Sequence, residues 1–61
     1  MCELKVVLLK NGNKEVIMED VIRITVMENT IRLFGLLGSK KDIQGKIMEI
    51  NLTKQEAIIR D

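Results

Sequence analysis

The sequence lacks histidine and proline, and among its 61 residues it has one cysteine and one aromatic side chain. Without histidine, neither a Ser-His-Asp or Cys-His catalytic site nor a His-ligated metal site can form. The single cysteine, Cys2, excludes a disulfide within the chain. Phe34 offers little surface on which nucleic acid bases could stack. Because no nucleophile–base pair is present, we do not expect an enzyme.

The sequence also lacks an excess of charge of either sign and has no long apolar run. Ten Lys and Arg residues against nine Asp and Glu residues give a net charge of +1, which implies no strongly charged partner. No apolar run approaches the roughly 20 residues that span a membrane. Glu3 and Lys5 interrupt the apolar start that a signal peptide needs. We therefore expect a cytoplasmic protein with one small domain, residues 1–61.

The residues that are abundant favour strands. Nine Ile, five Val and three Thr are β-branched, and such side chains fit a pleated sheet better than a helix. Asn11-Gly12 is the preferred pair for a type I′ hairpin turn, since both positions need positive φ. Short apolar stretches between turn residues predict five or six strands, at residues 2–10, 14–18, 21–27, 30–37, 43–52 and 57–60. This spacing is typical of an all-β sandwich or small barrel.

The alternation of apolar residues along these strands predicts which side chains are buried. The predicted interior consists of Leu4, Val6, Leu8, Ile22, Ile24, Val26, Ile31 and Leu33. A second apolar set remains on the opposite face: Val7, Leu9, Phe34 and Leu36. A chain of this size has a marginal core and rarely exposes so much apolar surface as a monomer. We therefore expect a homodimer that covers the second set.

Cys2 is the one chemical lead. A cytoplasmic thiol is most often a small buried hydrophobe, and Cys2 is in phase with Leu4 and Val6. If Met1 is removed, however, Cys2 combines a free amine, an amide nitrogen and a thiolate, which suits the planar N,S coordination of Ni(II) or Cu(II). Zinc needs four tetrahedral ligands, which one chain without histidine cannot supply. Two Cys2 residues of a dimer could instead share one ion.

Two charged groups are weaker candidates. Glu19 and Asp20 could offer oxygen ligands, but neighbouring residues of a strand point to opposite faces, and a solvated turn is the simpler interpretation. Lys40, Lys41 and Lys46 could contact phosphates, yet the balanced charge is far from that of a typical nucleic-acid-binding domain. RNA binding, or a structural module with an inert thiol, therefore remains an alternative.

Three segments carry a resemblance to a known family: Met1–Leu8, Met18–Val21 and Gly45–Leu52. Their order, in a short chain with cysteine at position two, resembles the CooT family. The resemblance implies a single CooT-like β-barrel domain with an SH3-like or Sm-like architecture, and a homodimer. It also implies that Cys2 binds Ni(II), and that the protein is a nickel metallochaperone for an enzyme client, carbon monoxide dehydrogenase. Many members of this family are labelled as predicted RNA-binding proteins.

Overall fold

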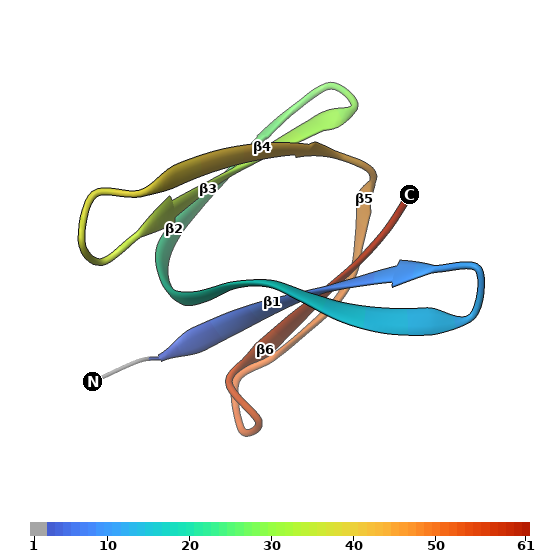
Figure 1. The fold of residues 1–61 in the computed structure, drawn as a ribbon, viewed down its shortest axis with the longest axis horizontal. Coiled ribbons are helices and arrows are strands. Elements are labelled where there is room, and N and C mark those ends of the chain that lie inside the picture. Colours follow the sequence, from blue (N-terminus) through green and yellow to red (C-terminus); the bar gives the residue numbers. More distant parts are fainter. Residues whose placement is uncertain (1–2) are drawn as a thin grey trace.

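In the computed structural model, which describes residues 3–61, six strands form one sheet (Figure 1). The strands are β1 (Leu4–Lys10), β2 (Asn13–Met27), β3 (Thr30–Gly35), β4 (Lys40–Gln44), β5 (Lys46–Asn51) and β6 (Glu56–Arg60). Their order in the sheet is β4-β3-β2-β1-β6-β5. β1 and β6 pair in parallel, whereas the other neighbours pair antiparallel. The prediction of an all-β fold is therefore confirmed.

The sheet is not closed into a barrel, so the prediction of a closed barrel is wrong. β4 and β5 stand at the two ends of the strand order, and no ladder joins them. They follow each other in the chain across Gly45, and Figure 1 shows the curled sheet bringing them to a common corner. Gly45 has a φ of 153°, and its amide donates to the carbonyl oxygen of Asn29 at 3.1 Å. The bend at Gly45 sends β4 to β3 and β5 to β6, and each strand keeps one unpaired edge.

The first hairpin is the predicted one, but the strand that follows is longer than expected. Asn11 and Gly12 both have positive φ, as a type I′ turn requires. Residues 14–18 and 21–27, which we expected to be two strands, belong to the single 15-residue strand β2. The strand bends at Asp20, whose φ is 54°, but it continues through the bend. The carbonyl oxygen of Asp20 accepts a hydrogen bond of 2.9 Å from the amide of Leu36.

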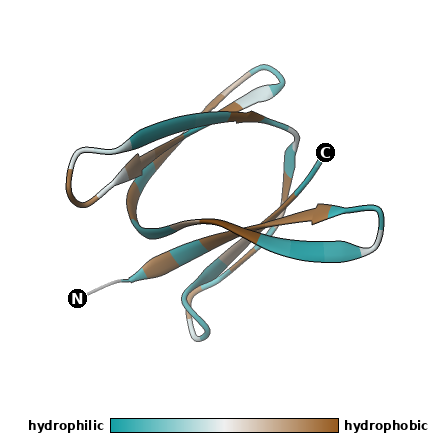
Figure 2. Ribbon diagram, viewed as in Figure 1, coloured by the Kyte–Doolittle hydropathy of each residue, from teal (hydrophilic) through white to brown (hydrophobic). Residues whose placement is uncertain are grey.

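Residues 39–42, which lie between two predicted strands and which we expected to be a polar loop, are mostly strand β4, and β3 ends at Gly35 instead of Leu37. Two backbone hydrogen bonds close the tight turn between these strands. The amide of Gly35 donates to the carbonyl oxygen of Ser39, and the amide of Gly38 donates to the carbonyl oxygen of Gly35. Figure 2 shows β4 as largely hydrophilic, which is common for an edge strand because charge discourages further pairing. The expectation of a loop was wrong because the charges of β4 reflect its edge position.

The core lies on one face of the curled sheet and contains Val6, Val21, Ile31, Leu33, Ala57 and Ile59. Of the predicted interior, Val6, Ile31 and Leu33 are buried, and Leu4, Leu8 and Ile24 pack half-buried against them. Ile22 and Val26 are exposed, so their predicted burial was wrong. Ile22 is the extra residue where the β2–β3 register shifts, and Val26 lies one residue before the end of β2.

The second apolar set does not form the exposed patch that we expected. Val7 is buried, because β1 lies inside the sheet and pairs Val7 with Val16 of β2 and Ile58 of β6. Leu9 and Phe34 are half-buried, and the guanidinium of Arg23 lies 5.0 Å from the ring centroid of Phe34. Of the set, Leu36 is exposed.

Candidate metal site at the amino terminus

Cys2, the predicted metal ligand, lies outside the described residues. The structure does describe the segment that follows Cys2, from Glu3 onward. The chain enters the sheet at Leu4, which pairs with Val21 of β2. Lys5 pairs with Glu56 of β6, and its amide donates to the carbonyl oxygen of Gln55 at 2.9 Å. Because β1 has a hydrogen-bonded neighbour on each side, the segment immediately after Glu3 is held firmly in the sheet.

A hollow of about 220 Å³ lies beside this entry point. It is lined by Glu3, Lys5, Glu19, Asp20, Lys54 and Gln55. The lining mixes carboxylates with amines, and within residues 3–61 no three potential side-chain ligands lie close enough together to hold a metal ion. The carboxylates of this hollow therefore do not make a metal site of their own.

The acidic pair at this hollow belongs to a bent strand instead of the predicted turn. Glu19 and Asp20 lie within β2 and are exposed. Asp20 occupies the left-handed region, which Asp and Asn tolerate better than most residues. The Met-Glu-Asp-Val segment that carried part of the family resemblance therefore forms the bend beside the start of β1. An acidic residue between two apolar stretches was the available signal for this bend.

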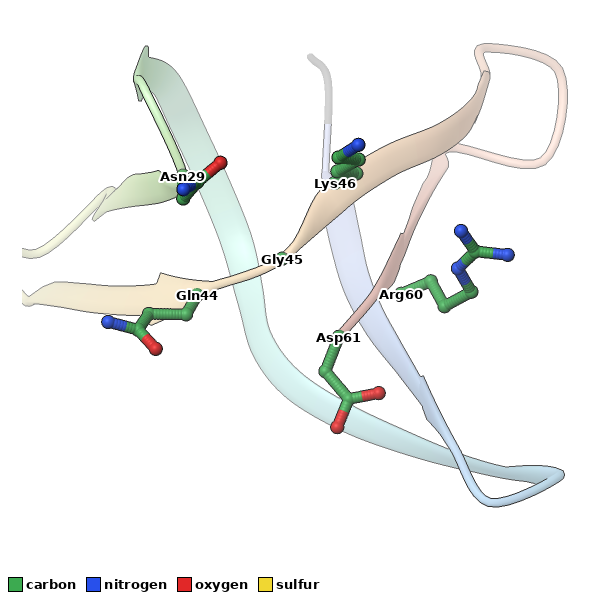
Figure 3. A pocket seen from close by; sticks show the side chains of 6 residues that line it. All are labelled: Asn29, Gln44, Gly45, Lys46, Arg60 and Asp61. Carbon is green, nitrogen blue, oxygen red and sulfur yellow. The ribbon is translucent and has the colours of Figure 1, made fainter.

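A second hollow, of about 260 Å³, surrounds Gly45 at the corner between β4 and β5. It is lined by Asn29, Gln44, Gly45, Lys46, Arg60 and Asp61. Figure 3 shows that these side chains point away from one another instead of converging on a common point. The hollow therefore presents no organised set of ligands.

The predicted basic residues are spread over two strands. Lys40 and Lys41 are consecutive residues of β4, whereas Lys46 lies at the start of β5. Consecutive residues of a strand point to opposite faces, so Lys40 and Lys41 do not reinforce each other. On β3 and β4, Arg32 is bound by Asp42, which neutralises it. These residues do not form the contiguous basic surface that a nucleic-acid-binding domain presents.

Comparison with known proteins places the chain in a family. A family model described as "CO dehydrogenase accessory protein CooT" matches residues 1–60. The chain belongs to the CooT family. This confirms the resemblance seen in the sequence, and the family is described as an accessory protein of CO dehydrogenase and not as the enzyme itself.

Two relatives and one solved structure are similar to this chain over two thirds or more of its length. An uncharacterized protein of Methanothermobacter thermautotrophicus is 39% identical over 59 residues, which cover 97% of this chain and 88% of that protein. One from Archaeoglobus fulgidus is 31% identical over 42 residues, 69% of this chain and 93% of that protein. The crystal structure of a protein from Carboxydothermus hydrogenoformans, assigned as CooT, superposes with a TM-score of 0.88. It covers 97% of this chain and 95% of its own at 22% identity, and so shares the fold. In residues 3–61 we find no helix long and apolar enough to cross a membrane.

Proposed function

We propose that this CooT family member is an accessory protein that binds Ni(II) through Cys2 and supplies it to an enzyme client such as CO dehydrogenase. The observation that carries the proposal is the family match over residues 1–60, which includes the single cysteine of the chain. An accessory protein for a metalloenzyme needs a site that binds its cargo and can also release it. Cys2 is the one residue of this chain that offers a thiolate.

The donor chemistry at the amino terminus suits nickel. A thiolate and neighbouring backbone nitrogens form chelate rings in a planar arrangement, which Ni(II) accepts. The chain has no histidine, and residues 3–61 hold no cluster of three potential side-chain ligands. Backbone nitrogen donors beside Cys2 therefore complete the proposed set, with the free amine of Cys2 included once Met1 has been removed.

We place the functional unit in the cytoplasm, where the thiol stays reduced, and propose that it is a homodimer. The support for a dimer is the apolar surface of a marginal small domain: nine large hydrophobic side chains are exposed among the described residues. In a dimer each chain can bind one ion, or the two Cys2 thiolates can share one. The number of nickel ions per chain separates these two arrangements.

The test is a titration of metal-free, Met1-trimmed protein with Ni(II), followed by absorbance in the region of thiolate-to-nickel charge transfer. We expect a band that saturates at one ion per chain or one per two chains. Cys2→Ser should lose the band and the tight binding while keeping the fold, which circular dichroism checks. Glu3→Gln is the matched control next to Cys2, because it removes a carboxylate but no thiol. Nickel binding of equal strength in Cys2→Ser would refute the assignment.

A further inference from the structure

Three cations form a row across the outer face of the sheet. Lys46 of β5 pairs with Arg60 of β6, Arg60 pairs with Leu9 of β1, and Leu9 pairs with Lys14 of β2. Because directly paired residues of neighbouring strands point to the same face, these side chains share one face. Leu9 follows Leu8, which packs against the core, so that face is the one opposite the core. We call Lys46, Arg60, Leu9 and Lys14 the basic row.

The cations of the basic row have no acidic partner in the described part of the chain. All three are exposed, and the one ion pair among residues 3–61 joins Arg32 and Asp42. Asp61 follows Arg60, but Figure 3 shows these two side chains pointing in different directions. The row therefore presents three positive charges along one line, a local excess that the net charge of +1 does not reveal.

An apolar row lies beside the basic row on the same face. Two residues away along each strand, Ile58 of β6 pairs with Val7 of β1, and Val7 pairs with Val16 of β2. Val16 is 49% exposed and Ile58 is half-buried, so the row presents aliphatic surface about 7 Å from the cations. Glu49 of β5 pairs with Ile58 and ends this row with an acidic side chain. Apolar side chains of a partner therefore fit over β6, β1 and β2.

The position of the two rows decides how a partner can bind. β6 and β1 lie inside the sheet with a paired strand on each side, so no further strand can pair with them. A partner must lie on the face, where helices commonly cover sheets. Strands are spaced about 4.8 Å apart, so the basic row is about 14 Å long, the length of roughly ten helical residues. Acidic side chains three and four residues apart in a helix recur about every 5–6 Å and can reach the cations in turn.

We propose that the outer face of β5, β6, β1 and β2 binds an acidic amphipathic helix of a partner protein. The carboxylates of the helix contact the basic row, and its apolar stripe packs on Ile58, Val7 and Val16. A helix is favoured over a nucleic acid because the surface beside the cations is aliphatic and offers no ring for base stacking. The one aromatic residue of the chain, Phe34, lies in β3, outside these four strands.

A synthetic peptide tests the charge of this surface. The probe is a fluorescent peptide of about 12 residues with glutamates along one side of the helix and leucines on the neighbouring side. A scrambled peptide of the same composition is its control. Fluorescence anisotropy with the metal-free full chain should show that the probe binds at least about tenfold more tightly than the scrambled peptide.

Matched charge reversals locate the binding surface. Lys14→Glu/Lys46→Glu should weaken binding of the probe by at least about tenfold, because two attractions become repulsions. Lys40→Glu/Lys41→Glu makes the same change of net charge on β4 and should leave the affinity within about threefold of that of the parent. A probe with lysines in place of its glutamates should bind Lys14→Glu/Lys46→Glu more tightly than it binds the parent. Circular dichroism checks that each variant is folded.

A second pair of variants tests the apolar row without changing charge. Val16→Ser should weaken binding of the probe by about threefold or more, because it removes apolar contact area. Val26→Ser is the matched control, since Val26 also lies in β2 and is 58% exposed, but pairs with Ile31 on the core face. It should leave binding unchanged. Equal effects of the two serine substitutions would remove the apolar row from the proposed surface.

Three other outcomes would overturn the proposal. They are a parent that does not distinguish the probe from its scrambled form, equal losses in the two double charge variants, and tighter binding of a short single-stranded RNA that Lys14→Glu/Lys46→Glu abolishes. The last would assign the basic row to phosphates. The inference goes beyond the nickel proposal and does not rest on it. Metal-free Cys2→Ser keeps every residue of this surface and should bind the probe like the parent, whether or not Cys2 binds nickel.

Discussion

Arg32 and Asp42 face each other across β3 and β4 and form two hydrogen bonds, with Nε donating to Oδ1 at 2.8 Å and Nη2 to Oδ2 at 3.0 Å. The pair holds the edge strand β4 in register with β3 through a planar, two-point contact. Both side chains are solvent-exposed, so the pair contributes more to register than to stability. It explains how a segment as polar as Lys40–Asp42 belongs to a strand.

The hydrogen bond from Arg32 lowers the pKa of Asp42 below its ordinary value of 3.8. A carboxyl group whose folded pKa is lowered stabilises the fold above its unfolded pKa, and this contribution is lost as the pH falls through the folded value. We expect Asp42→Asn to be slightly less stable than the parent at neutral pH, with the difference shrinking as the pH falls below 3.8 and disappearing once the pH is below the lowered folded pKa. Urea unfolding over a pH series measures this. A difference that is the same at every pH would contradict it.

Gly45 should tolerate no side chain. A Cβ atom there would lie 2.5 Å from the carbonyl oxygen of Arg60 and 3.0 Å from Cγ2 of Ile59, and the φ of 153° is strained for other residues. We expect Gly45→Ala to lower the free energy of unfolding by about 2 kcal/mol or more. Gly12→Ala is the control, because its φ is also positive but no atom lies within 4 Å of the added Cβ. Equal losses in urea denaturation would show that backbone strain alone, and not the contact with β6, limits Gly45.

Two leucines provide a matched test of the core. Leu33 is fully buried in β3, whereas Leu37 is 95% exposed in the turn that follows. Leu33→Ala should cost about 2–5 kcal/mol of unfolding free energy through lost burial and the cavity left behind. Leu37→Ala should change it by less than about 0.5 kcal/mol. Chemical denaturation measures both, and a large loss in Leu37→Ala would place that side chain in an interface.

The sequence predicts the class of this fold well, because that depends on composition and local turns. β-Branched residues favour strands anywhere in the chain, and Asn11-Gly12 specifies its hairpin locally. The face of the sheet on which each side chain lies is less predictable, because one extra residue in a strand moves every later side chain to the opposite face. Ile22 lies at such a register shift in β2 and was assigned to the interior, whereas its neighbour Val21 is buried.

The edges of the sheet could not be predicted for a related reason. Whether a strand lies at an edge depends on which distant strand pairs with it, and Lys40 and Lys41 resemble loop residues until β3 is seen beside them. The candidate site is different, because Cys2 was proposed from its residue chemistry and from the family resemblance, neither of which needs a long-range contact. The segment that follows Cys2 did need the fold, since the bend at Asp20 and the carbonyl oxygen of Gln55 meet the start of β1 only in three dimensions.

Nickel binding should depend on pH in a definite direction. The thiol and the nitrogen donors beside Cys2 must lose protons to bind the metal, so binding releases protons. We expect the affinity for Ni(II) to rise with increasing pH across the neutral range. Titrations in a series of buffers that differ in ionisation enthalpy measure the number of protons released. An affinity independent of pH would mean that the ligands are not the thiolate and amide nitrogens.

Equilibrium dialysis of nickel against the parent protein and Cys2→Ser tests the central claim most directly. Mass spectrometry first establishes that Met1 has been removed, and the dimer content of both samples is matched. The account predicts that the parent retains one Ni(II) per chain or one per two chains, and that Cys2→Ser retains none after exchange into metal-free buffer. Equal retention of nickel by both proteins would contradict the account, because it would place the metal on residues other than Cys2.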